Sequence, residues 1–124
     1  MPIIDVHVVV PEAATLPAAL ASSLADALGR VLAAAPGHAW LRLHTLDAGC
    51  YAENDCLLGD QDLPVFVTVL HARWPPADAL ARQAEALARA VAAVLGRDAQ
   101  RVHVEFAPAG AGRVAFGGRL LPPG

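Results

Sequence analysis

Residues 1–10 read MPIIDVHVVV, and this stretch guides the interpretation of the whole sequence. It is rich in Val and Ile and is followed by Pro11, which predicts a β-strand. The second residue of the stretch is a proline. If Met1 is removed, Pro2 carries a secondary amine at the head of the chain. An amine at the head of a buried strand is able to act as a base or as a nucleophile.

The composition predicts a single domain that associates with other copies of itself. The chain has 124 residues, of which 56% are hydrophobic and only 17% are charged. Soluble domains usually carry about 25% charged residues, so the low value indicates that some faces are hidden in an oligomer. The net charge of −3 leaves no basic footprint for nucleic acid, and no nucleic-acid partner is expected.

Neither a metal site nor a membrane segment is expected from the sequence. Cys50 and Cys56 are the only cysteines, and their spacing matches no zinc pattern. Asp5 interrupts the first apolar run and no basic segment precedes it, which argues against a signal peptide. No apolar run approaches the roughly 18 residues of a membrane span. We therefore expect a cytoplasmic protein.

Alternating and apolar runs predict strands, and leucines at helical spacing predict helices. Thr15 is the predicted cap of a first helix, which ends near Ala35 because Pro36-Gly37 follows. Asp78 is the predicted cap of a second helix, which Gly96 ends. The predicted strands cover residues 1–10, 40–46, 64–71 and 102–106, with a short final strand at 119–121 and a long connection at 47–62.

The order of these elements indicates an internal repeat. Setting Pro2 against Pro64 runs two β-α-β units in parallel, residues 1–62 and 63–124 of one domain, 1–124. The predicted fold class is α+β, a tandem β-α-β repeat in which two helices cover one face of a four-stranded sheet.

The strand predicted at residues 64–71 argues that the other face of the sheet is covered as well. Val65 and Val67 lie on one of its faces, and Phe66 and Leu70 lie on the other. A sheet that is apolar on both faces requires a partner on both. Other copies of the chain are expected to supply the second cover.

Three features of the sequence together resemble the tautomerase superfamily: Pro2 opening a strand, the doubled β-α-β order, and a predicted hairpin at Gly117-Gly118 near residue 124. The closest likeness is to 4-oxalocrotonate tautomerase, in the long form that fuses two short subunit lengths. The resemblance implies the fold shared with macrophage migration inhibitory factor, in which three chains form a trimeric barrel. It also implies an enzyme that needs no cofactor and binds a small anionic carboxylate.

The mechanism implied by the resemblance is keto-enol proton transfer. The amino-terminal proline acts as the general base for a 1,3- or 1,5-transfer on a small unsaturated 2-hydroxy or 2-oxo carboxylate. An α-amino group ordinarily titrates near about 8. Desolvation and nearby arginines both disfavour its protonated form and lower its pKa toward neutrality. Arginine suits the substrate carboxylate because its fork donates two parallel hydrogen bonds.

Carried over to this sequence, the resemblance differs between the two units. Pro2 takes the catalytic position. Arg101 aligns with the arginine that begins the family's second strand, and Arg73 lies within one residue of the arginine that follows the first strand. In the first unit, Trp40 stands at the position that Arg101 takes in the second unit. The nitrogen of Pro64, the counterpart of Pro2, is an amide within the chain. The first unit is thus expected to supply the amine and the second unit the cations, at one kind of active site per chain.

Three further side chains are candidates for contact with the substrate. Tyr51 stands where the family has an aromatic residue lining the pocket, and Phe116 or Val114 takes the matching place in the second unit. Arg42 points either into the site or to solvent. Three histidines on the predicted strands are expected to line the barrel or face solvent: His7, His44 and His103.

Several other functions stay open at this point. A ferredoxin-like ligand-binding module is one alternative, with the repeats as antiparallel neighbours, a monomeric or dimeric state and a dispensable Pro2. A tautomerase-fold protein that has lost catalysis and serves in protein interaction is another. Within the superfamily, hydratase, dehalogenase and decarboxylase activities use a carboxylate that activates water or assists. The sequence places no such carboxylate, although it offers Asp47, Glu53 and Glu105.

Overall fold

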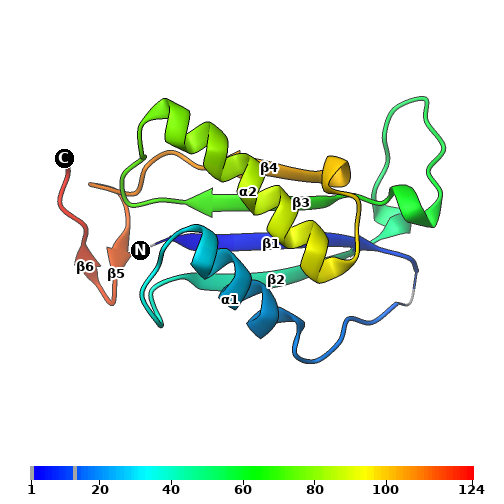
Figure 1. Cartoon of the computed structure of the whole chain (residues 1–124), viewed down its shortest axis with the longest axis horizontal. Coiled ribbons are helices and arrows are strands. Elements are labelled where there is room, and N and C mark those ends of the chain that lie inside the picture. Colours follow the sequence, from blue (N-terminus) through cyan, green and yellow to red (C-terminus); the bar gives the residue numbers. More distant parts are fainter. Residues whose placement is uncertain (1, 13) are drawn as a thin grey trace.

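The computed structural model describes residues 2–12 and 14–124, and over these residues the chain is α+β (Figure 1). The main elements in chain order are β1 (Ile3–Val10), α1 (Leu20–Val31), β2 (Trp40–Asp47), β3 (Val65–Leu70), α2 (Ala77–Leu95), β4 (Val102–Phe106), β5 (Ala115–Phe116) and β6 (Arg119–Leu120). Short 3-10 turns lie at Ala48–Cys50, Asp60–Asp62 and Ala99–Arg101. The doubled β-α-β order is therefore as predicted, while the division at residues 62 and 63 stays a prediction.

The four long strands form one mixed sheet in the order β2-β1-β3-β4. β2 runs parallel to β1 and β4 runs parallel to β3, whereas β1 and β3 are antiparallel. Ile3 consequently lies opposite both Trp40, the first residue of β2, and Leu70, the last residue of β3. We call the end of the sheet at which β1 and β2 begin the Pro2 end. The opposite end, at which β3 and β4 begin, is the Pro64 end.

The strand order separates this fold from the ferredoxin-like alternative. In that arrangement each β-α-β unit is split, so that another strand lies between its two strands. Here β2 is the direct neighbour of β1, and β4 is the direct neighbour of β3. Antiparallel contact between the units, expected above for the alternative, occurs here as well, between β1 and β3. Strand order, and not strand direction, is the discriminating feature.

The first helix is shorter at both ends than the sequence predicts. Thr15 caps nothing, because the chain first makes a turn in which the Leu20 amide donates to the Pro17 carbonyl at 3.2 Å. The helix begins at Leu20 after Ala19, whose side chain forms no capping hydrogen bond. It ends at Val31, since Ala33 adopts a left-handed φ of 52°. A positive φ at a non-glycine residue terminates helical geometry, and the chain turns before Pro36 is reached.

The second helix, in contrast, begins one residue before its predicted cap. Pro76 holds the cap position and its carbonyl accepts from the Leu80 amide at 2.9 Å. Asp78 is therefore a residue of the first turn, where its carboxylate binds Arg82 at 3.3 Å. Gly96 ends α2 as predicted, with a left-handed φ of 66°.

The core lies between the two helices and one face of the sheet. Figure 1 shows α1 and α2 side by side across that face. Alternate residues of β1 and β3 point into this layer, and the leucines predicted to form one stripe of α1 meet them there. The buried residues that form this core cluster are Ile4, Val6, Val8, Val10, Leu20, Leu24, Leu28, Val65, Val67, Val69, Leu87, Val91, Ala92 and Val102.

The second face of the sheet is left uncovered by helices, and we call it the open face. It carries the intervening side chains of each strand, which face away from the core. Phe66 is among them and is 37% exposed. Part of this face is shielded near the Pro64 end, where the Tyr51 ring lies 5.8 Å from that of Phe66. β3 thus carries apolar side chains on both faces, as predicted, and helices cover only one of these faces.

At the Pro64 end, Arg97 connects separate segments by donating hydrogen bonds to backbone carbonyls. Its Nη1 donates to the Leu63 carbonyl at 2.8 Å, and its Nη2 donates to the Val9 carbonyl at 2.9 Å. Burial lowers the pKa of this guanidinium. The group joins the segment after α2 to the end of β1 and to the connection before β3.

Replacing Arg97 with methionine is expected to lower the free energy of unfolding by about 2 kcal/mol, because hydrogen bonds from charged donors are each worth about 1.5–3 kcal/mol. Urea unfolding measures this loss. Arg82→Met is the matched control, since among the described residues Arg82 binds only the exposed Asp78 and such pairs contribute below about 1 kcal/mol. Equal losses in the two variants would contradict a role for the carbonyl contacts.

Among residues 2–12 and 14–124, no helix combines the length and the apolar character needed to cross a lipid bilayer.

Candidate active site

Pro2 lies at the head of a strand in the middle of the sheet. It is buried, and its carbonyl accepts a hydrogen bond from the Trp40 amide at 3.1 Å. This bond extends the parallel pairing of β1 and β2 by one position and fixes the proline against the neighbouring strand. The predicted removal of Met1 lies outside the described residues.

Arg73 lies at the same end of the sheet as Pro2, although it comes from the second unit. Because β3 runs antiparallel to β1, the residues that follow Leu70 arrive beside the start of β1. The Arg73 side chain is exposed, and its Nη2 donates to the Pro122 carbonyl at 3.0 Å. Figure 1 shows the start of β1, the end of β3 and the β5–β6 hairpin gathered at this end. The fold therefore brings a cation from one unit toward the proline of the other.

Arg101 and Tyr51 lie at the Pro64 end and do not meet Pro2 within one chain. Arg101 precedes β4, whose first residue Val102 lies opposite Val65. The eight residues of β1 separate this end from Pro2 by roughly 25 Å, at about 3.3 Å per residue. Of the two arginines predicted to serve one site, the chain thus places only Arg73 near its own proline.

The side chains at the Pro64 end form a connected polar triad. The Tyr51 hydroxyl donates to Glu53 Oε2 at 2.7 Å, and Arg101 Nη2 donates to the same oxygen at 2.8 Å. Arg101 Nε is buried and has no hydrogen-bond partner among the described residues. The hydrogen bond from Tyr51, followed by that from Arg101, lowers the pKa of the Glu53 carboxyl. The triad holds an ionised carboxylate between a phenol and a guanidinium.

Removing the Tyr51 hydroxyl is expected to raise the pKa of Glu53. A lowered pKa in the folded state contributes stability above the ordinary value near 4.3, and this contribution is lost as the pH falls through the folded value. In Tyr51→Phe the Glu53 carboxyl should titrate at higher pH than in the unchanged protein, as followed by NMR of the side-chain carboxyl carbon. The pKa of Asp5, which lies elsewhere, should stay unchanged. An unchanged Glu53 titration would contradict the role of the phenol.

Arg42 lies on the open face, where it binds a carboxylate of its own chain. Its Nε and Nη2 donate to the two oxygens of Asp5 at 2.7 and 2.9 Å, a bidentate pair. These hydrogen bonds are the main cause that lowers the pKa of Asp5, and His44 Nε2 at 3.3 Å adds to them. Arg42 is thus a largely exposed side chain (64%) held against Asp5, and its contact with a substrate stays a prediction.

The three histidines gather in a single row across the open face. His44, His7, Phe66 and His103 are successive cross-strand neighbours on β2, β1, β3 and β4. The His7 and His44 rings are stacked with centroids 4.5 Å apart, and the Phe66 and His103 rings are 5.4 Å apart. Among the described residues, no three His, Cys, Asp or Glu side chains are placed to share a metal ion.

Phe116 lies at the Pro2 end, against Trp40. The two rings meet edge to face, with centroids 5.4 Å apart and an interplanar angle of 78°. Phe116 is carried there by the β5–β6 hairpin, which turns at Gly117 and Gly118. Both glycines have positive φ, so the predicted hairpin is present and depends on them. Residue identity alone did not indicate the contact between Phe116 and Trp40.

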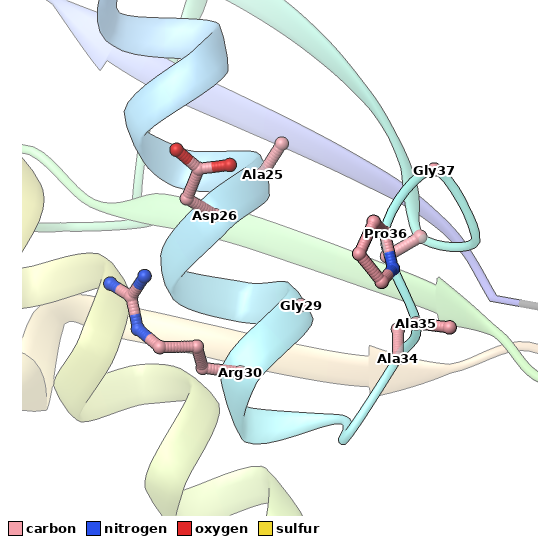
Figure 2. A pocket seen from close by; sticks show the side chains of 9 residues that line it. Ala25, Asp26, Gly29, Arg30, Ala34, Ala35, Pro36 and Gly37 are labelled. Atoms are coloured by element: carbon pink, nitrogen blue, oxygen red, sulfur yellow. The ribbon is translucent and has the colours of Figure 1, made fainter.

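One hollow in the described part of the chain contains none of the predicted site residues. It measures about 420 Å³ and lies beside α1 and the loop before β2. Figure 2 shows Asp26 and Arg30 directed away from the loop that carries Pro36. The rest of the lining is mostly alanine and glycine, so no converging polar groups mark this hollow as a binding site.

Comparison with solved structures identifies the architecture. The protein Pt0534, inactivated by 2-oxo-3-pentynoate, superimposes with a TM-score of 0.74 at 16% identity, covering 95% of this chain and 94% of its own. A wild-type fused 4-OT, described as an asymmetric trimer, gives a TM-score of 0.74 at 18% identity over 95% of this chain and 94% of its own.

The chain has the tautomerase-superfamily fold. A third member, FG41 malonate semialdehyde decarboxylase inhibited by 3-bromopropiolate, has a TM-score of 0.67 and 19% identity over 92% of this chain and 88% of its own. No family model matches the sequence. No curated protein matches it either. The tautomerase fold is thus detected through structure, while fewer than one residue in four is shared with these relatives.

Proposed function

We propose that this protein is a cytoplasmic, homotrimeric, cofactor-independent tautomerase in which Pro2 is the general base. The observation that carries the proposal is the position of Pro2, buried at the head of the central β1 with Arg73 brought to the same end by β3. Burial disfavours a protonated amine, and a nearby guanidinium disfavours it further. Both effects favour a base poised for proton transfer near neutral pH.

The proposed reaction moves one proton and leaves the atomic composition of the substrate unchanged. Arg73 binds the carboxylate of a small unsaturated 2-hydroxy acid through its planar fork. The Pro2 nitrogen accepts the proton of the enol hydroxyl, the hydroxyl carbon becomes a carbonyl, and a proton returns from the nitrogen to carbon 3 or carbon 5. An arginine beside the carbonyl end stabilises the negative charge that develops there.

A neighbouring copy completes the site in this proposal. Arg101 and Tyr51 lie at the Pro64 end of their own chain, so they serve as substrate contacts only where that end meets the Pro2 end of another chain. The open face supports association, because helices cover only one side of an apolar sheet. A fused 4-OT of similar fold is described as a trimer, which supports three copies. Arg42 is bound to Asp5 and is the weakest of the proposed contacts.

The first experiment is an intact-mass measurement on protein made without an amino-terminal tag. Loss of one methionine means that the secondary amine exists, and enol-to-keto conversion is then followed by ultraviolet absorbance. Conversion by the processed protein, and not by protein that retains Met1, is the expected result. Retention of Met1 in every molecule would exclude Pro2 as the base and favour an interaction protein without catalysis.

Introducing a charge on β3 at the open face is expected to dissociate the trimer. Phe66→Lys places an ammonium group on a surface that three copies would bury, where an unpaired charge is strongly unfavourable. The molecular mass measured by light scattering should fall from that of three chains to that of one. Ala81→Lys, on an exposed position of α2, is the control and should keep the larger mass. A Phe66→Lys protein that keeps three chains would contradict this interface.

Water addition or decarboxylation is a second candidate, favoured by the triad at the Pro64 end. Glu53 is held ionised by Tyr51 and Arg101, as a carboxylate that activates water would be. One structure of similar fold is a malonate semialdehyde decarboxylase. Release of carbon dioxide from malonate semialdehyde, or of chloride from 3-chloroacrylate, would identify this chemistry, and Glu53→Gln should abolish it.

A further inference from the structure

The carboxylate that holds Arg101 leaves one donor of this guanidinium unused. Arg101 Nη2 donates to Glu53 Oε2 at 2.8 Å, and the Tyr51 hydroxyl donates to the same oxygen at 2.7 Å. Arg101 Nε is buried and has no acceptor among the described residues. Glu53 therefore engages through a single oxygen a group whose fork is able to donate two parallel hydrogen bonds to one carboxylate.

A second arginine of the same chain shows what a fully matched carboxylate does. Arg42 donates from Nε and Nη2 to the two oxygens of Asp5, at 2.7 and 2.9 Å. These are the same two nitrogens that Glu53 fills only in part at Arg101. An unsatisfied buried donor is unfavourable, so an acceptor that reached Arg101 Nε as well as Nη2 would be held more firmly than Glu53.

Glu53 and Arg101 belong to segments of different kinds. Arg101 ends a 3-10 turn, where its amide donates to the Asp98 carbonyl at 2.9 Å, and it leads directly into the paired strand β4. Glu53 lies in the connection between β2 and β3, in a turn where its carbonyl accepts from the Cys56 amide at 3.3 Å. Figure 1 shows this connection extending beyond the Pro64 end of the sheet. The Glu53 side chain is thus able to leave Arg101 with every strand pair intact.

The surroundings of the pair decide what could replace Glu53. The side chains of Arg101 and Glu53 are only 27% and 31% exposed. A guanidinium in such a place loses much if its carboxylate departs alone, because an uncompensated charge is left partly removed from water. Glu53 is therefore expected to leave only in exchange for another anion. A planar carboxylate fits best, since its two oxygens match Nε and Nη2.

We propose that Glu53 occupies the place of a ligand carboxylate at Arg101, and that a bound carboxylate displaces it by accepting from both Nε and Nη2. The inference rests on the proposed function, in which Arg101 is a substrate contact. It adds a residue that competes with the substrate and so sets the affinity of the site for anions. Glu53 is held ionised by the hydrogen bonds from Tyr51 and Arg101, so it competes as a charged group.

Calorimetric titration with fumarate tests this competition. Fumarate carries planar carboxylates and no enol, so its affinity is measured whether or not the protein is an enzyme. Glu53→Gln should bind fumarate at least tenfold more tightly than the unchanged protein. The amide keeps the shape of the side chain, but its hydrogen bond to the guanidinium has lost the negative charge that strengthens it.

Glu85→Gln is the matched control and should leave the affinity unchanged. It removes the same charge from an exposed pair with Arg89 on α2, so it reports the effect of net charge alone. Adding Arg101→Met to Glu53→Gln should cancel the gain, which assigns the gain to the contact between the two residues. Urea midpoints verify that each variant is folded. Glu53→Asp keeps the charge but shortens its reach, and it should tighten binding in the same direction to a smaller extent.

The sign of the change separates the possible roles of Glu53. Weaker binding of fumarate by Glu53→Gln would make Glu53 a support that holds Arg101 in place, and would overturn the inference. Unchanged affinity, or no binding by either protein, would overturn it as well. Loss of chloride release from 3-chloroacrylate without a gain in affinity would assign Glu53 to the activation of water instead. A gain in affinity in a protein that converts no enol supports the inference and ends the proposal of catalysis alone.

Discussion

Replacing Pro2 with alanine is expected to lower kcat/KM for enol-to-keto conversion by about 10²–10⁴-fold, the range that a positioned general base contributes. Alanine at this position would carry a primary amine of different basicity and without the ring that fixes its direction. The backbone bond from Trp40 to the carbonyl of residue 2 is retained in the variant, so β1 keeps its pairing with β2. The loss should therefore appear in activity and not in folding.

Pro64→Ala is the control that the repeat itself supplies. Pro64 is buried like Pro2, and its carbonyl accepts a hydrogen bond from the Val9 amide at 3.1 Å. Its nitrogen is an amide within the chain and has no basic lone pair. Steady-state kinetics should show near-normal activity for Pro64→Ala beside the deficient Pro2→Ala, with intact mass verifying the amino terminus of both. Full activity in Pro2→Ala would end the proposal of general-base catalysis by this residue.

Replacing Leu24 with alanine is expected to lower the free energy of unfolding by about 2–5 kcal/mol, the range for truncating a fully buried leucine. Leu24 is 0% exposed, and it lies on the stripe of α1 that packs against the sheet. The substitution removes apolar area from the core and leaves a cavity that close packing fills only in part. Most small domains are stable by only about 5–15 kcal/mol, so this loss is a large share of the total.

Leu57→Ala is the matched control for that substitution. Leu57 is 100% exposed in the connection before β3, so the same chemical change should alter stability by no more than about 0.5 kcal/mol. Urea unfolding of both variants at one protein concentration measures the difference, since the stability of an oligomer depends on concentration. Similar losses in the two variants would contradict the assignment of Leu24 to the core.

The sequence was informative about elements because each element imposes a period on its own residues. The stripe of leucines in α1 and the alternation in β2 reflect a buried face that repeats every 3.6 or every 2 residues. Helix ends were less predictable. Thr15 and Asp78 have side chains suited to capping, yet the chain turns at Pro17 before α1 and begins α2 at Ala77. The choice among possible first turns depends on the packing of the whole helix and not on one side chain.

The sequence singled out candidate site residues, and their roles stay predictions. Pro2, Arg73 and Phe116 could be singled out by residue type and position in the repeat, and they lie at one end of the sheet. Arg101 is predicted to serve the same site, although within one chain it lies at the opposite, Pro64 end of the sheet. The partners of the arginines were not predictable, because Asp5 and Arg42 are 37 residues apart and Glu53 and Arg101 are 48 apart.

By itself, the sequence determined the doubled β-α-β order, the core stripes of the two helices, the closing hairpin and the candidate base at Pro2. The tertiary structure alone decided which of these residues meet. The antiparallel contact of β1 with β3 brings the residues after β3 to Pro2 and carries the start of β4 away from it. The hairpin sets Phe116 on Trp40, 76 positions earlier in the chain. Local periodicity is fixed by the backbone geometry of each element, whereas strand direction and register follow from burying all the apolar faces at once.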